Sequence, residues 1–180
     1  MKITGISPWL VAVPNHDPGI LYSQGQPGSE PSRAVPTRQY VFVQVDTDEG
    51  ITGWGEITTY PGPVANRAVC SVVREVAPLL IGHDASRIED AWHKVFRTFT
   101  YVGTRGFTTA VASGIDIALW DIRGKALGLP IYDLLGGAVR DSIAVYTHFP
   151  YARTAEESAR NALVPVRDGI KAIKTDPFWE

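Results

Sequence analysis

The chain has 180 residues, enough for one ordinary domain or for one domain and part of a second. Hydrophobic residues make up 44% of it and five are tryptophans, so a packed core is expected and wholesale disorder is excluded. The formal net charge of −2 and the scattered basic residues argue against nucleic acid or an anionic membrane surface as a partner.

The cysteine content and the N-terminus bear on the compartment. Cys70 is the only cysteine, which excludes an internal disulfide framework, and its apolar helical surroundings favour a buried thiol. The N-terminus lacks a basic region followed by a long apolar run, so no signal peptide is predicted. No apolar segment approaches the roughly 18 residues of a membrane span. We therefore expect a soluble, cytoplasmic protein.

The first 58 residues predict a three-stranded antiparallel sheet. The apolar pattern favours a strand over residues 2–13, and two further strands over 39–46 and 51–57. The turn between the last two, residues 46–50, is too short for a parallel crossover. Glu56 is a tempting acid in the third strand, but we interpret it as a polar strand-end residue that ties down the neighbouring loop.

Two connections flank these strands. Residues 14–38 are rich in proline and glycine and have no periodicity. Long loops of this kind are often lids or binding loops, and an unstructured surface excursion is the alternative. The shorter Thr58–Pro63 turn follows the third strand.

Two amphipathic helices are predicted over residues 61–81 and 85–101, with Asp84 as the N-cap of the second. His83 and His93 lack a partner at metal-ligand spacing, so we interpret them as surface or cap residues. The expected buried stripe of the first helix is Val64, Ala68, Val72, Val76 and Leu79 or Leu80, and that of the second is Ile88, Ala91, Trp92, Val95, Phe96 and Phe99.

A third helix over residues 107–127 has the widest apolar face of the chain. Gly114 in its middle costs about 1 kcal/mol relative to alanine. We interpret that glycine as the sign of another backbone packed closely against the helix. Gly128 and Pro130 are expected to end it.

The same helix carries a family resemblance. Ser113–Gly137 reads S-G-I-D-I-A-L-W-D-I-R-G-K-A-L-G-L-P-I-Y-D-L-L-G-G and resembles the signature of the enolase superfamily, in its mandelate racemase and muconate-lactonizing branch. The resemblance implies an α+β capping domain, a three-stranded antiparallel meander plus helices, over residues 1–137. Residues 138–180 would then begin a modified TIM barrel.

The pattern after Gly137 agrees with the start of a barrel. Residues 142–148 and 170–175 are predicted strands, and Thr154 and Glu157 form a capping box that opens the helix between them. Pro165 is expected to kink or fray the end of this helix, and Gly169 to cap it. Strand, helix and strand within about 35 residues is typical of a parallel βαβ unit.

The end of the second barrel strand points to a reaction class. In the racemase branch this strand ends in Lys-x-Lys, whose first lysine lies near the substrate carboxylate and whose second can act as a base. Here Lys174 matches the first position and Asp176 stands at the second. Lys174-Thr-Asp-Pro-Phe178 resembles the ending of sugar-acid dehydratases of the gluconate and galactonate type.

The resemblance implies that the full-length protein is a Mg²⁺-dependent sugar-acid dehydratase that abstracts a proton α to a carboxylate. No metal ligand is expected within this chain, since Asp116 and Asp121 on one helix are interpreted as structural, and the 180 residues alone are expected to be inactive.

Alternatives are a racemase or cycloisomerase of the same branch, or a truncated, non-catalytic assembly module. We also expect a homo-oligomer that binds a small sugar acid or another carboxylate. Candidate catalytic residues are Lys174 and Asp176, and candidate substrate-binding residues are Tyr22, Gln24, Arg33, Thr59 and Tyr60.

Overall fold

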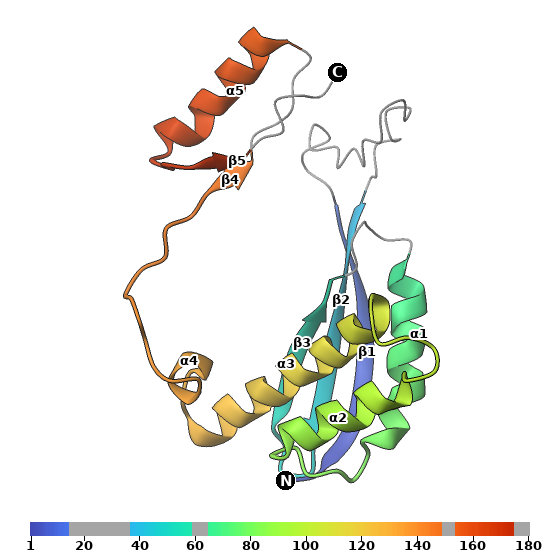
Figure 1. Ribbon diagram of the computed structural model, residues 1–180. Coiled ribbons are helices and arrows are strands. Elements are labelled where there is room, and N and C mark those ends of the chain that lie inside the picture. Colours follow the sequence, from blue (N-terminus) through green and yellow to red (C-terminus); the bar gives the residue numbers. More distant parts are fainter. Residues whose placement is uncertain (15–36, 59–64, 149–153, 175–180) are drawn as a thin grey trace. The chain divides into compact units, whose positions relative to one another are not determined.

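The computed structural model describes residues 1–14, 37–58, 65–148 and 154–174 (Figure 1). The chain divides into two compact units. The first comprises Met1–Val13 and Thr37–Ala138, and the second comprises Pro14–Pro36 and Val139–Glu180.

A three-stranded antiparallel sheet forms the centre of the first unit, as predicted. Its strands are β1 (Ile3–Pro14), β2 (Thr37–Thr47) and β3 (Thr52–Ile57), in the order β1-β2-β3. In the hairpin between β2 and β3, Thr47 Oγ1 accepts a hydrogen bond from the Ile51 N–H at 3.1 Å and donates one to the Ile51 carbonyl at 2.8 Å. The side chain of Thr47 therefore fixes the turn and, with it, the register of the two strands.

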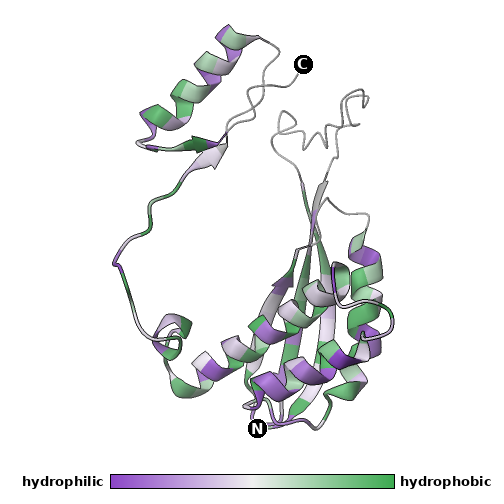
Figure 2. Cartoon of the chain, in the orientation of Figure 1, coloured by the Kyte–Doolittle hydropathy of each residue, from purple (hydrophilic) through white to green (hydrophobic). Residues whose placement is uncertain are grey.

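Helices cover one face of this sheet (Figure 1). They are α1 (Asn66–Val76), the 3₁₀ helix η2 (Ala77–Leu79), α2 (Ile88–Thr98) and α3 (Phe107–Leu127). The short α4 (Ile131–Leu134) follows α3, contacts it and has no buried residue. Hydrophobic and hydrophilic residues interchange along α1 and α2, as expected of helices with one buried face (Figure 2). The core contains the inward side of β2, Val41, Val43 and Val45, packed with Val111, Ile115, Leu119 and Ile122 of α3.

The closest contact lies between β3 and α3, and glycine makes it possible. A Cβ added at Gly53 would overlap the Ala118 carbonyl, and one at Gly55 would overlap the carbonyl of Gly114. A Cβ at Gly114 would in turn overlap Ile57. The prediction that Gly114 marks a close backbone approach is confirmed, and the approaching backbone is that of β3.

The buried stripe predicted for α1 is confirmed in part. Val76 and Leu80 are buried and Val72 is half-buried, but Ala68 is exposed, and the fully buried Val69 and Val73 were not predicted. Val64 lies outside the described residues. Valine or alanine occupies positions on both possible stripes, so the sequence alone does not choose between them. The observed rotation buries the larger side chain, Val69 in place of Ala68, which removes more apolar surface from water. The stripe predicted for α2 is confirmed, with Ile88, Ala91, Val95 and Phe99 buried and Trp92 and Phe96 half-buried.

The role predicted for Asp84 was also wrong. The N-cap of α2 is Arg87, which makes no side-chain capping bond. Asp84 instead forms an isolated antiparallel bridge with Lys2, and its Oδ1 accepts a hydrogen bond from the Ser86 N–H at 2.9 Å. Asp84 is paired with Lys2 at the end of the sheet and lies three residues before Arg87, so its side chain does not cap α2.

The second unit contains the predicted βαβ arrangement in a shorter form. The strands β4 (Thr147–His148) and β5 (Ile173–Lys174) are parallel and are joined through α5 (Ala155–Arg167). Residues 142–146, predicted as strand, are not assigned to a strand in the structure. Ile143 and Val145 are 77% and 64% exposed. A strand is stabilised by burial of at least one face, and these residues have no such burial here.

The helix of this unit begins as the sequence predicts. Thr154 is the N-cap of α5, and its Oγ1 accepts a hydrogen bond from the Glu157 N–H at 3.1 Å. Pro165 lies inside the last turns of the helix without ending it. Gly169 follows the helix with a φ of +83°, which a side chain would disfavour, and turns the chain toward β5. Among the described residues, no helix is both long and apolar enough to cross a bilayer.

Candidate active site

The carboxyl ends of β4 and β5 are the described part of the candidate active site. Thr147 pairs with Ile173, and His148 pairs with Lys174, in a parallel register. In barrels built from parallel strands and helices, the chemistry is located at the carboxyl ends of the strands. The last residue of each strand, His148 or Lys174, stands at that end.

Lys174 is the predicted catalytic residue that the structure describes. It is exposed at the end of β5, and it forms no ion pair with any other described residue. A lysine ammonium is a compact cation with three hydrogen-bond donors. An unpaired ammonium at this position can therefore bind and neutralise a carboxylate.

The other predicted site residues lie outside the described residues. They are Asp176, Tyr22, Gln24, Arg33, Thr59 and Tyr60.

The two segments that carry the predicted substrate-binding residues are attached at one end of the sheet. β1 ends at Pro14 and its neighbour β2 begins at Thr37, while Ile57 at the end of β3 pairs with Val41 near the start of β2. The buried Asn66 at the start of α1 donates a hydrogen bond to the Gln39 carbonyl at 3.2 Å. The described residues that flank positions 15–36 and 59–64 therefore lie at the same end of the sheet.

The described residues do not fit a magnesium site. Mg²⁺ requires several oxygen ligands in near-octahedral geometry. Among the described residues, no group of three histidine, cysteine, aspartate or glutamate side chains could hold a metal ion.

Asp121 has the structural role predicted for it. Its Oδ2 accepts a hydrogen bond from the Trp54 N–H at 2.8 Å and pairs with Lys125 Nζ at 2.7 Å. Lys125 Nζ also donates to the Thr52 carbonyl at 2.8 Å. This network joins the middle of α3 to β3, next to the glycine contact.

Asp116 lies one turn earlier on α3 and is half-buried. Burial raises the pKa of its carboxyl group above the ordinary value of 3.8, and the negative charge of Glu89 raises it further. Cys70 is buried as predicted, and desolvation raises the pKa of its thiol. A raised pKa disfavours the thiolate, so Cys70 is not activated as a nucleophile.

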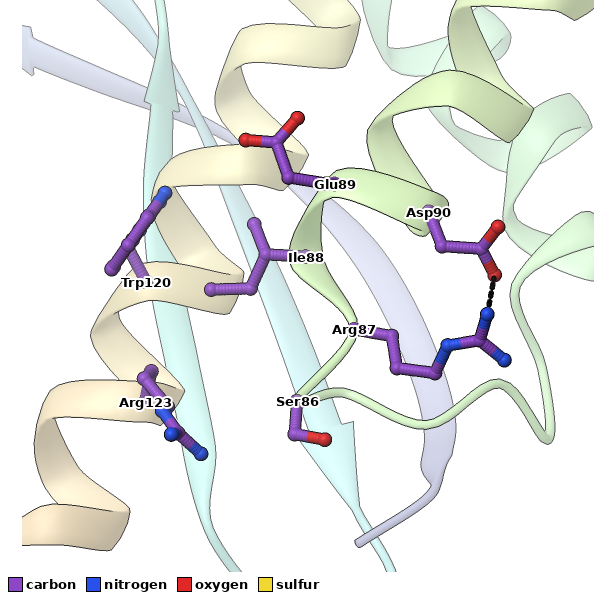
Figure 3. Close-up of a pocket in the computed structure, with 7 residues that line it drawn as sticks. All are labelled: Ser86, Arg87, Ile88, Glu89, Asp90, Trp120 and Arg123. Atoms are coloured by element: carbon purple, nitrogen blue, oxygen red, sulfur yellow. Dashed lines mark ion pairs between the residues drawn. The ribbon is translucent and has the colours of Figure 1, made fainter.

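A separate pocket of about 400 Å³ lies between the start of α2 and the middle of α3 (Figure 3). Ile88 of α2 and Trp120 of α3 give it an apolar wall, and Arg87 turns toward Asp90, with 3.5 Å between Nη2 and Oδ2. The sequence did not predict this pocket because it depends on how two helices far apart in the chain pack. Its lining residues are Ser86, Arg87, Ile88, Glu89, Asp90, Trp120 and Arg123.

Comparison with known proteins relates this chain to the family that the signature helix suggested. The chain is 42% identical over 147 residues to a D-galactonate dehydratase of Ralstonia pickettii, which covers 80% of this chain and 34% of the relative. Its fold matches an enolase from Pantoea ananatis, solved with bound D-gluconate and Mg, with a TM-score of 0.73 and 33% identity over 96% of this chain and 35% of that one. It also matches the 3,6-anhydro-D-galactonate cycloisomerase from Zobellia galactanivorans, with a TM-score of 0.74 and 30% identity over 96% of this chain and 42% of that one.

The chain spans about a third of the length of the curated relatives that it matches. Residues 24–136 match the model of the N-terminal domain of mandelate racemase and muconate lactonizing enzymes. This match covers more than half of the chain and includes the sheet strands β2 and β3 and the helices α1 to α4. The chain therefore belongs to the mandelate racemase / muconate lactonizing enzyme family of the enolase superfamily.

Proposed function

We propose that the complete protein carrying these 180 residues is a sugar-acid dehydratase. The observation that carries the proposal is the similarity to D-galactonate dehydratase, which extends over 147 residues. In this proposal, residues 1–137 form the capping domain, and β4, α5 and β5 are the first elements of the barrel. The substrate is a small sugar acid with a carboxylate and a hydroxyl group on the β-carbon.

Lys174 supplies the cation in this reaction. Removing the proton α to a carboxylate places further negative charge on the carboxylate oxygens, and a nearby ammonium stabilises that charge most when it is largest. Lys174 has the exposure and the unpaired charge for this role. Loss of the β-hydroxyl with acid assistance then completes the dehydration.

Asp176 is proposed to assist without acting as the base. A carboxyl group has a reference pKa near 4 and is a weak base for a carbon acid unless its pKa is raised. Asp176 would orient a substrate hydroxyl or steady Lys174, and the base would come from the opposite side of the substrate. A base on one side suits dehydration and disfavours racemisation, which requires a base on each side.

Mg²⁺ is proposed as the cofactor of the complete protein, with ligands outside this chain. The support is the related Pantoea ananatis structure, which holds Mg together with D-gluconate. Tyr22, Gln24, Arg33, Thr59 and Tyr60 remain proposed contacts to the polyol. We also propose that the complete protein forms a homo-oligomer.

Turnover of a panel of sugar acids, beginning with D-galactonate and D-gluconate, tests the dehydratase proposal. With Mg²⁺ present, the complete protein is expected to form a 2-keto-3-deoxy acid. Lys174→Ala is expected to lower kcat/KM at least about a hundred-fold, since it removes a charged contact. Asp176→Asn is expected to retain exchange of the substrate α-hydrogen with solvent.

Different results would contradict different parts of the proposal. Interconversion of stereoisomers without dehydration would identify a racemase instead. Loss of α-hydrogen exchange in Asp176→Asn, with fold and Mg²⁺ affinity intact, would identify Asp176 as the base. Micromolar Mg²⁺ affinity of the isolated 180 residues, measured by calorimetry, would contradict the assignment of the ligands to residues outside this chain.

A further inference from the structure

The pocket between α2 and α3 is a feature of the first unit that the proposed reaction does not use. Its apolar wall consists of Ile88, which is buried, and Trp120, which is half-buried. Glu89 and Arg123 lie at opposite ends of the pocket, with Ile88 and Trp120 between them (Figure 3). Neither of these two charged side chains forms an ion pair with another described residue.

The order of the groups along α3 gives this surface a charge pattern. Asp116, Trp120 and Arg123 are four and three residues apart, so they share a face of the helix. Glu89 belongs to the Asp116 end, because burial, and next to it the negative charge of Glu89, raises the pKa of the Asp116 carboxyl group. A helix rises about 1.5 Å per residue, so the two ends are about 10 Å apart. Along α3 the surface is therefore negative, then aromatic, then positive.

A surface with this pattern is complementary to a second copy of itself. In a dimer with two-fold symmetry both copies use the same surface, and every contact occurs twice. With the axis beside Trp120, the two α3 helices run antiparallel, and Arg123 of each copy faces Glu89 of the other. The two Trp120 rings then meet between the ion pairs. Tryptophan and arginine are the residue types that most often dominate the binding energy at the centre of an interface.

Other occupants fit the pocket less well. Small-molecule sites bury about 70–90% of the ligand surface. In this pocket the lining residues Ser86, Arg87, Glu89 and Asp90 are exposed, so one side is open to solvent. A uniformly acidic or uniformly basic protein would be attracted to one end of the surface and repelled by the other.

We propose that the surface formed by Ile88, Glu89, Trp120 and Arg123 is an interface between two copies of the complete protein. This inference rests on the proposed homo-oligomer and assigns a surface to it. Each copy contributes Arg123 to one ion pair and Glu89 to the other. The apolar wall of each pocket is covered by the other copy.

Charge reversal in the complete protein tests this interface by sedimentation velocity. Arg123→Glu places a carboxylate opposite Glu89 in both contacts, and Glu89→Arg places two guanidinium groups opposite each other in both. Because like charges facing each other strongly disfavour association, each variant is expected to raise the Kd of pairing at least about a hundred-fold. The mass of the assembly should then fall about two-fold. Arg67→Glu reverses an exposed charge on α1 and should leave the mass unaltered.

Mixing the two single variants gives the sharpest measurement. The Arg123→Glu copy is negative at both positions, and the Glu89→Arg copy is positive at both, so the two together form both ion pairs again. The mixture is expected to recover a dimer with one copy of each variant, detected by native mass spectrometry. The double variant Arg123→Glu/Glu89→Arg should recover pairing with itself. A variant that has lost its fold cannot recover pairing in this way.

The results separate this inference from the other proposals. An unmodified complete protein that sediments as a monomer would overturn both the homo-oligomer and this interface. An oligomer of unaltered mass in both single variants would overturn the interface and leave the homo-oligomer intact. Single variants that dissociate but fail to pair on mixing would also overturn the interface. Turnover of sugar acids tests the dehydratase proposal independently of these results.

Discussion

The two units of this chain differ in how much of their apolar surface they bury. The first unit has a continuous core that includes residues such as Val41, Val43, Ile115 and Leu119, each at most 2% exposed. In α5 of the second unit, Pro165 is the only described residue that is buried. Side chains that a folded unit normally covers, such as Ile143, Val145, Leu163 and Val164, are between 49% and 77% exposed.

This difference shows that helices and strands can be present where no hydrophobic core is enclosed. The described part of the second unit has a capped helix and a parallel strand pair, yet these two strands and one helix enclose no interior among the described residues. An isolated strand pair is marginally stable because most of its stability comes from burying a face. The first unit satisfies that requirement with a sheet and three helices. Four experiments test or sharpen the comparison.

Hydrogen exchange of the 180-residue chain should show the largest effect. Amides of the first unit, such as that of Val43, are expected to exchange only on global unfolding, and that of Ile173 through local opening that costs little free energy. The difference in protection is expected to be at least about a thousand-fold, which corresponds to about 4 kcal/mol. A monomer by sedimentation with full protection at Val145 and Ile173 would show that the second unit is stable without a core.

Gly55→Ala is expected to be the most damaging single substitution in the first unit. The added Cβ meets the backbone carbonyl of Gly114, which cannot move without shifting α3. Overpacking of this kind costs about 1–3 kcal/mol or more, and contact with backbone places Gly55 at the upper end. Urea unfolding followed by tryptophan fluorescence measures the loss. The neighbouring Glu56→Ala is exposed and should change the free energy of unfolding by less than about 0.5 kcal/mol.

Asp121→Ala tests the polar network beside this contact. The variant leaves the Trp54 N–H without its acceptor and Lys125 without its ion-pair partner. Because Asp121 is partly exposed, the expected destabilisation is about 1 kcal/mol rather than the larger value for a buried group. Lys125→Met removes the ion pair and the hydrogen bond to the Thr52 carbonyl but keeps the bond from the Trp54 N–H to Asp121, and it should cost less. Equal losses in the two variants would show that the bond to Trp54 contributes no more to stability than the bond to the Thr52 carbonyl.

Asp116→Asn should have the smallest effect, and its sign depends on pH. The folded protein holds the pKa of Asp116 above its ordinary value, so the folded state binds this proton more tightly than the unfolded state does. The resulting stabilisation is present below the ordinary pKa and is lost as pH rises through the raised value. At pH 7 the charged carboxylate therefore costs stability, and Asp116→Asn should raise the free energy of unfolding, by about 0.5 kcal/mol or less given the solvent exposure of the group. The gain should vanish near pH 3.5, and a gain of equal size at both pH values would contradict the assignment.

Local sequence determined those features that depend on neighbours along the chain. The hairpin follows from its short turn, and the capping box of Thr154 and Glu157 is made by residues three apart. The ordered pattern of Ser113–Gly137 was long enough to identify the family. Gly114 indicated that another backbone packs closely against the helix, but it did not indicate which segment supplies that backbone. Lys174 was placed at the end of a parallel strand by the same local reasoning, and the structure places it there.

Tertiary structure decided what depends on contacts between distant segments. The partner of Gly114 is β3, which lies about 60 positions earlier in the chain, and no local pattern could identify it. The rotation of α1 was set by its packing, since valine or alanine stands on both candidate stripes, and Asp84 was diverted from the helix by pairing with Lys2. The pocket beside Trp120 and the pairing of His148 with Lys174 likewise require two elements to meet. Periodicity shows which side of an element is apolar, but only burial against a specific partner shows where that side must point.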